Sequence, residues 1–178
     1  MTYYGAKELA EAARTVRKNT LNIAEDIPED KYGFQAAKDV RTVEKLLTHI
    51  ALSARIQHQV HSEKRMTLEG FNFPAAFQEM MAEEAKPRTK AQVIALLREE
   101  GEKWANFVAG LSDDFLGQTL TMPQGGNPPT RIRFDMIMSV KEHEMHHRGQ
   151  LMLIERILGI TPHLTRQMQE RMARVQQK

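Results

Sequence analysis

The segment that decides the fold is residues 134–158, with the sequence FDMIMSVKEHEMHHRGQLMLIERIL. Steps of four and three residues along it pick out one face of a helix. That face is apolar at both ends and polar in its middle: Met136, Val140, His143, His147, Gln150, Ile154 and Ile157. Because a stripe of this kind normally packs against other helices, the pattern predicts a long helix that carries two histidines into the interior of a bundle.

The rest of the chain supplies partner helices at the same spacing. We expect them over residues 6–24, 36–62 and 89–110, with a short tail helix that starts at Pro162 and has Thr161 as its N-cap. Val40, Val43, Leu47 and Ile50 form the expected core face of the second helix.

Two long connections separate these helices. Residues 63–88 have room for a short helix, and residues 111–133 contain the breaker cluster PQGGNPPT between two alternating segments. Such alternation around a turn predicts a small hairpin at 116–134. The expected fold is therefore all-α: a four-helix bundle with long crossover loops, this hairpin and a short C-terminal helix.

Composition limits the class of protein. The chain has 178 residues, of which 41% are hydrophobic and 27% charged, and it contains no Cys. This predicts a single domain over 1–178, with its core at about 6–160 and a tail helix at 161–178. Without Cys there is no disulfide, thiolate metal site or catalytic thiol, which fits a cytoplasmic protein. We expect no membrane segment, because there is no run of 18 apolar residues and no signal-peptide pattern.

The charge pattern gives no indication of nucleic-acid binding. The net charge is only +2, and no dense basic stripe with interleaved aromatic residues occurs. A solvated, basic helix face in the tail accounts for the small excess of positive charge.

The two inward histidines, His143 and His147, need partners for their ring nitrogens. A buried polar group without a hydrogen bond costs about 1–3 kcal/mol. A divalent metal is one answer, since two histidines at i and i+4 on a helix can bind one ion. Buried water or a carboxylate is the other.

A third ligand would come from another part of the chain, and the candidates are His49, His58, His61 and His163. His49 lies in the centre of the second helix, at the edge of its buried stripe. His58 and His61 stand among polar residues near the end of that helix and are expected to be solvated, and His163 is expected to be exposed. We therefore favour His49 as the third ligand. The alternative is that His49 is a core histidine hydrogen-bonded to a neighbour.

Three other residues are candidates for the surroundings of this site. Gln150 follows His147 by almost one turn on the inner face, so it could touch a ligand or a metal-bound histidine. His146 is one step off that face and could shuttle protons, and Ser53 shares a side with His49. Gly149 costs about 1 kcal/mol relative to Ala within a helix, which suggests that another element approaches closely there.

At this point the sequence resembles a known family. HEMHHRGQL at 143–151 is similar to the HxxxHRGQ signature of the DinB superfamily, the DinB/YfiT-like metalloenzymes. KYGFQAAKDVRTVEKLLTHIA at 31–51 resembles the second-helix segment of that family, in which the first ligand stands in a similar context. TRIRFDMIMSVKEHEMHH resembles the run into the last long helix. The resemblance extends from about Leu9 to Gly159, and departs at residues 35–37, where relatives often have a proline.

The resemblance implies a bundle with a three-histidine metal site made of His49, His143 and His147. It implies one divalent ion per chain, nickel or zinc, with open positions for water or substrate. It also favours an enzyme that transfers a small thiol, such as bacillithiol, mycothiol or glutathione, to an electrophilic substrate. The partners would then be that thiol and the electrophile.

Two alternatives stay open. One is a metal-dependent hydrolase, in which the ion activates water. The other is a non-catalytic, stress-related bundle that binds metal or forms a homodimer. Its interface would use Met80, Met81 and an apolar stripe on the tail helix, although that stripe could equally pack on its own bundle: Leu164, Met168, Met172 and Val175.

Overall fold

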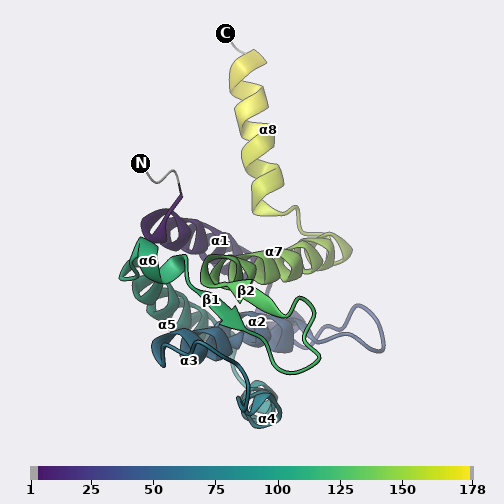
Figure 1. Ribbon diagram of the computed structural model, residues 1–178. Helices are drawn as coiled ribbons and strands as arrows, with labels where there is room; N and C mark the ends of the chain where they lie inside the picture. The colour runs from purple at the N-terminus through teal and green to yellow at the C-terminus, as the bar shows by residue number, and fades with distance from the viewer. Residues whose placement is uncertain (1–3, 177–178) are drawn as a thin grey trace.

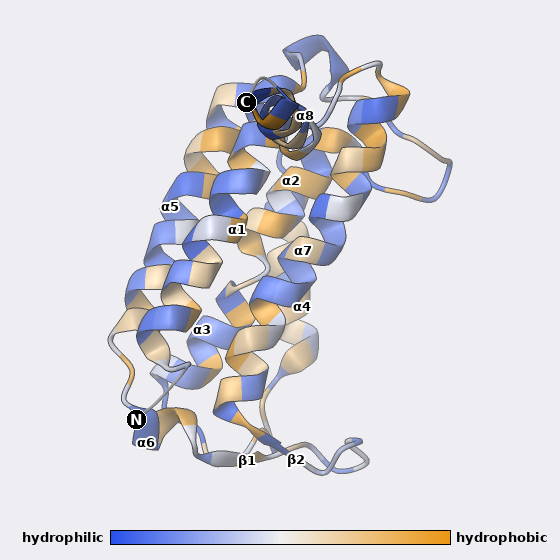
Figure 2. Ribbon diagram, turned by 90° about the horizontal axis from the view of Figure 1, so that it is seen from above, coloured by the Kyte–Doolittle hydropathy of each residue, from blue (hydrophilic) through white to orange (hydrophobic). Residues whose placement is uncertain are grey.

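The computed structural model describes residues 4–176, and its body is built from four long helical segments (Figure 1). These are α1 (Ala6–Asp26), α2 with α3 (Val43–Leu52 and Arg55–Ser62), α5 (Lys90–Ala109) and α7 (Arg133–Ile157). α5 packs on α1 and α2, and α7 packs on α1, α2 and α3. Figure 2 shows apolar and polar residues alternating along these helices, and the buried apolar residues of all four segments form the core. The predicted all-α bundle is confirmed.

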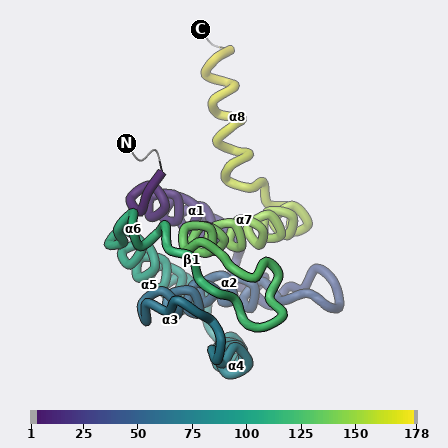
Figure 3. The backbone as a smooth tube through the Cα atoms, in the orientation of Figure 1, coloured from purple at the N-terminus to yellow at the C-terminus, as the bar shows by residue number. Residues whose placement is uncertain are grey.

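The remaining elements lie at the periphery of this bundle. They are η1 (Glu29–Lys31), α4 (Phe73–Ala85), α6 (Asp113–Leu116), β1 (Thr119–Thr121), β2 (Thr130–Ile132) and α8 (His163–Gln176). α4 packs on α2 from outside the bundle. β1 and β2 pair antiparallel within the predicted 116–134 hairpin, with Leu120 opposite Arg131. The tube in Figure 3 traces the backbone through the long connections between the helical segments.

The second helix is shorter than its predicted range of 36–62. It begins only at Val43, where the Thr42 hydroxyl accepts a bond from the Lys45 amide, and Val40 is 46% exposed rather than part of the core. The Gln35 side-chain amide donates to the carbonyls of Lys38 and Val40. This local turn satisfies backbone groups that a helix would otherwise use.

The same helix is interrupted between α2 and α3. Ser53 Oγ donates to the Ile50 carbonyl at 2.9 Å, and a serine that bonds back to the preceding turn bends a helix. The bend separates the straight segment that carries His49 from α3.

The tail helix α8 projects away from the bundle (Figure 1). Its first turn is attached by Arg166, which pairs with Asp26 at 2.6 Å, and by His163, whose Nε2 lies 3.1 Å from Asn19 Oδ1. Beyond this base, Met168 and Met172 are each 57% exposed. The outer residues of the tail stripe, Met168, Met172 and Val175, therefore do not pack on the bundle, whereas Leu164 at its base is half-buried.

A buried ion pair joins the four helical segments at their centre. Arg17 on α1 binds Glu144 on α7 with its Nε at 2.9 Å from the nearer carboxylate oxygen, and Thr20 donates to the same carboxylate at 2.7 Å. The same guanidinium donates to the carbonyl oxygens of Leu97 on α5 and Ile50 on α2. Arg17 is 8% and Glu144 5% exposed, so each charge depends on the other for its partner.

Replacing Arg17 with Met leaves Glu144 buried without a cation, and loss of one partner of a buried pair typically costs about 3–5 kcal/mol. We expect the Arg17→Met variant to lose that much free energy of unfolding in urea titrations. The double variant Arg17→Met/Glu144→Leu should recover most of it. Arg98→Met, which breaks an exposed pair with Glu25, is the control and should cost less than about 1 kcal/mol. Equal losses in Arg17→Met and Arg98→Met would contradict this role.

A second buried polar pair makes stability depend on pH. His61 on α3 is 1% exposed, and Arg133 Nη1 donates to its Nδ1 at 3.0 Å. Burial, aided by the charge of Arg133, lowers the pKa of His61 to about 4, whereas an unfolded histidine titrates near 6.5. Between these values the unfolded chain binds a proton that the folded chain does not, so the free energy of unfolding falls as the pH drops from 6.5 toward 4.

We expect the metal-free chain to lose about 2–3 kcal/mol of stability from His61 alone between pH 7 and pH 4.5. Urea titrations at both pH values measure the loss. His61→Gln keeps an acceptor for Arg133 but does not titrate, so its loss should be smaller by that amount. An identical pH dependence in both proteins would rule out His61 as the source.

Candidate metal centre

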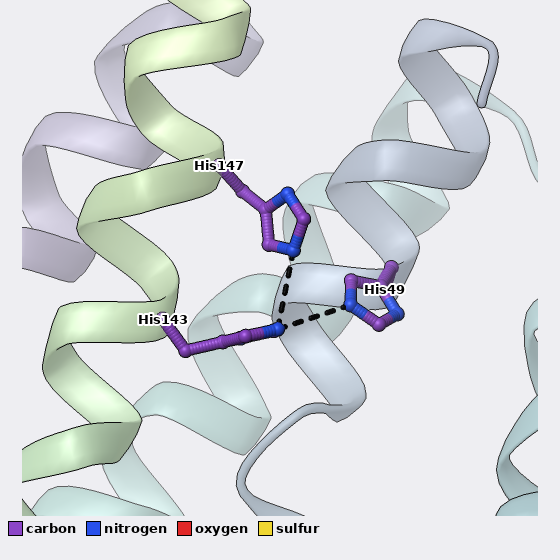
Figure 4. Close-up of side chains that lie close together, drawn as sticks. All are labelled: His49, His143 and His147. Atoms are coloured by element: carbon purple, nitrogen blue, oxygen red, sulfur yellow. Dashed lines mark hydrogen bonds between the residues drawn. The ribbon is translucent and has the colours of Figure 1, made fainter. Parts of the chain in front are cut away.

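Three imidazole rings meet at the interface between α2 and α7 (Figure 4). His49 comes from the middle of α2, and His143 and His147 come from successive turns of α7. The Nε2 atom of His143 lies 3.3 Å from that of His49 and 3.1 Å from that of His147. One ring nitrogen from each histidine falls within 4.8 Å of the others. The structure thus brings together the three residues that the sequence analysis selected.

The outer nitrogens of two rings are held by neighbours. His49 Nδ1 lies 3.1 Å from the Glu84 carboxylate, and His147 Nδ1 lies 2.8 Å from Gln150 Oε1. Because both partners are acceptors, each Nδ1 carries the proton and each Nε2 presents a lone pair to the centre. A hydrogen bond to the outer nitrogen also fixes the orientation of a metal-binding ring.

Glu84 was missed by the sequence analysis, which had no signal for it. It lies in the last turn of α4, 35 residues from His49 along the chain. Two residues hold it there. Arg41, just before α2, pairs with the carboxylate, and Lys45, in the first turn of α2, donates to the carbonyls of Glu84, Ala85 and Lys86. A lysine at the carbonyl end of a helix is favourable both as a donor and as a positive charge.

The environment keeps these imidazoles neutral. Burial lowers the pKa of His49, of His147 and of His143, and the pKa of His143 falls to about 4, with the neighbouring histidines adding to the effect. Neutral imidazole is the form that binds metal ions. When His143 carries its proton on Nδ1, three Nε2 lone pairs face one point.

The outer nitrogen of His143 differs from those of the other two rings. Its Nδ1 is buried and has no hydrogen-bond partner among the described residues. This Nδ1 is an unsatisfied acceptor if Nε2 carries the proton, and an unsatisfied donor if Nε2 binds an ion. A cation bound by the lone pairs of all three Nε2 atoms would remove the repulsion between those lone pairs. Three imidazole nitrogens are a ligand set that suits a divalent transition metal.

The other candidate histidines lie elsewhere. His58 is half-buried and packs against Phe107 with the rings tilted by 58° and their centroids 4.6 Å apart. Two expectations were wrong: His61 is buried against Arg133, and His163 is 4% exposed because the base of α8 packs over α1. His146 is exposed, and its Nε2 lies 3.4 Å from the Gln150 amide.

The expectation for Gly149 was also wrong. A Cβ built at this position would meet no described atom within 4 Å, so no element approaches it. The close approach occurs instead at Gly101 on α5, where a Cβ would lie 2.8 Å from Arg17 Cγ.

Two recesses open on different sides of the three rings. The smaller one, of about 220 Å³, is bounded by His49 and His143 and includes Ser53. The larger cleft, of about 650 Å³, is bounded by His147 and Gln150 and reaches Arg41 and Leu153. Small molecules can therefore approach the centre from both sides.

Within residues 4–176, no helix combines the length and the apolar character needed to cross a membrane. The comparison with curated proteins finds none that matches this chain.

Solved structures share the fold at low sequence identity. A DinB-like protein of Bacillus subtilis, YjoA, aligns with a TM-score of 0.65 and 21% identity, over 86% of this chain and 94% of that one. YfiT of Bacillus subtilis aligns with a TM-score of 0.68 and 14% identity, over 90% of this chain and 91% of its own. YfiT is described as a probable metal-dependent hydrolase with an unusual four-helix bundle topology. The family model of the DinB superfamily matches residues 12–151, which include all three histidines, and the chain belongs to that superfamily.

Proposed function

We propose that this protein is a metal-dependent enzyme that holds one divalent ion, nickel or zinc, between His49, His143 and His147. The observation that carries the proposal is the convergence of three Nε2 atoms whose outer nitrogens, in two cases, are already bonded to acceptors. A structural site normally has four protein ligands, whereas a set of three leaves a position for a reactant.

The reaction that we propose is transfer of a small thiol to an electrophile. A divalent ion with three neutral ligands keeps its positive charge and, when bound, lowers the pKa of a thiol or of water. The chain itself supplies the orientation of the rings, through Glu84 and Gln150, and the walls that separate the centre from solvent. The recesses on the two sides of the rings leave separate approaches for a nucleophile and an electrophile.

Hydrolysis is the second candidate. It is favoured by the similarity in fold to YfiT, which is described as a probable metal-dependent hydrolase. The two candidates share the ion and the ligands and differ in whether a thiol or water attacks the substrate.

Metal content measured by plasma mass spectrometry on untagged protein tests the centre. We expect about one nickel or zinc ion per chain, because three protein ligands and one open position describe a mononuclear site. His49→Ala and the double variant His143→Ala/His147→Ala should lose the ion. His58→Ala, a histidine outside the cluster, should keep it. Absence of metal after reconstitution with both nickel and zinc would refute the proposal.

Activity assays on the metal-loaded protein then separate the two reactions. The expected result is conjugation of an aryl halide to glutathione, bacillithiol or mycothiol, lost in His49→Ala and retained in His58→Ala. Hydrolysis of an activated ester without conjugation of any of the three thiols would assign water as the nucleophile instead.

The role of Glu84 can be measured as metal affinity. Removal of the group that bonds the outer nitrogen of a metal-binding histidine typically weakens metal binding about 10–100-fold. We expect this loss for Glu84→Ala and a smaller one for Glu84→Gln, which keeps an acceptor but no charge. Glu83→Ala, the adjacent position on α4, should bind metal like the wild type in competition with a chelating indicator. Equal affinity in Glu84→Ala and Glu83→Ala would show that the carboxylate has no such role.

A further inference from the structure

One outward-facing side of α7 combines apolar and charged residues in a symmetrical order. Steps of three and four residues place five residues on this side, which we call the outer face: Glu142, Met145, Gly149, Leu153 and Arg156. All five are exposed, Met145 by 42% and Leu153 by 59%. Large apolar side chains that gather on one exposed helix face, with polar residues at the rim, are typical of a contact surface.

Gly149, at the centre of the outer face, has no packing role within its own chain. A Cβ built there would meet no described atom within 4 Å, and its φ is not positive, so the backbone does not require a glycine. Glycine destabilises a helix relative to alanine. What the missing side chain does provide is a low point on the helix surface, where the backbone of another helix can come close. Because no element of its own chain uses this space, the approach would come from another molecule.

The outer face is self-complementary about Gly149. Met145 and Leu153 lie four residues before and after it, and Glu142 and Arg156 lie seven residues before and after it. Consider two such helices packed antiparallel around a two-fold axis at Gly149. Each Met145 then meets Leu153 of the second copy, and each Glu142 meets Arg156 of the second copy. A two-fold interface requires this order, because both subunits use the same surface.

Both charged residues are available for such a contact. Glu142 has no hydrogen bond or ion pair with any described residue. Arg156 donates to the Met152 carbonyl and to Thr165 Oγ1, at 2.9 and 3.2 Å, but forms no ion pair with a described carboxylate. Within one helix, Glu142 and Arg156 are about 21 Å apart. They therefore cannot pair with each other inside a single chain.

The outer part of α8 also lacks a packing partner. α8 has 14 residues, a length at which an isolated helix is only marginally stable in water. Met168, Met172 and Val175 are 57%, 57% and 75% exposed. α8 leaves the bundle beside the outer face, since Thr165 in its first turns bonds Arg156 (Figure 1). A second copy on the outer face would lie next to α8, where it could cover this apolar stripe.

We propose that the outer face of α7 binds the same face of a second copy of this chain, in an antiparallel two-fold arrangement that crosses at Gly149. Met145 and Leu153 form the apolar part of the contact, and two Glu142–Arg156 pairs close its ends. The inference is independent of the proposed function, because none of these residues is a ligand of the proposed ion. Leu153 also lines the larger cleft, so the second copy borders that cleft on the side of His147.

Sedimentation equilibrium of the full-length chain at low salt measures the association. We expect a dissociation constant on the order of 10 µM, as for a small interface. Glu142→Arg and Arg156→Glu should each raise it at least about tenfold, because both charge pairs become repulsive. The double variant Glu142→Arg/Arg156→Glu should restore the association of the wild type, since both pairs form again with exchanged signs. Glu99→Arg, an equal charge change at an exposed position on α5, should have no effect.

A cysteine at the two-fold axis tests the arrangement itself. The chain has no Cys, so Gly149→Cys introduces a single thiol, and a disulfide requires two Cα atoms within about 7 Å. Under mild oxidation we expect Gly149→Cys to form a covalent dimer and Ala95→Cys, exposed on α5, to stay uncrosslinked. Gly149→Arg places two bulky charges at the axis and should abolish association. Its circular dichroism spectrum should be unchanged, because the side chain has free space in the single chain.

Several results would overturn the inference. Sedimentation of the wild type as a monomer even at millimolar concentration would do so, as would a double charge variant that associates no better than the single variants. A dimer that cross-links through Ala95→Cys but not through Gly149→Cys would place the contact on another face. Each of these readouts is the same whatever the metal content, so failure of the interface and failure of the metal centre are distinguishable.

Discussion

The guanidinium of Arg17 on α1 forms hydrogen bonds with all three of the other long segments of the bundle. It enters from α1, pairs with Glu144 on α7, and donates to main-chain carbonyls on α5 and α2. Gly101 on α5 leaves the space for its stem. Since a buried charge without its partner is far more costly than a buried apolar side chain, the helices cannot slide or rotate freely past one another. The interior therefore has a defined register.

That register sets the direction of the metal-binding rings. Glu144 is adjacent to His143 in sequence but points to α1, whereas His143 and His147 point to α2. With Glu144 fixed on one side of α7, the rotation of the helix about its axis is determined, and the two histidines face His49. The buried ion pair and the histidine cluster thus lie on adjacent faces in the middle of one helix, which explains why that part of its inward surface is polar.

Much of this arrangement could be predicted from periodicity. The i and i+4 spacing of His143 and His147 between apolar residues was sufficient to place both on an inward face, and the position of His49 in α2 was sufficient to choose it. The pattern also contained Arg17 and Glu144, which occupy apolar stripes on their helices, but a charge at such a position gives no partner by itself. Glu84 could not be found, because its position depends on how α4 packs against α2, and no local pattern encodes that packing. The solvated state expected for His61 failed for the same reason: Arg133, which buries it, is 72 residues away.

One peripheral helix serves both functions of the centre. α4 contributes Glu84 to the outer nitrogen of His49, and it contributes Phe77 and Met80 to the wall of the smaller recess. A molecule in the recess that stabilises the position of α4 also stabilises the position of Glu84. Thermodynamic linkage requires this effect on the two sites to be reciprocal. Occupancy of the recess and affinity for an ion at the three histidines would then be coupled through a helix that lies outside the bundle.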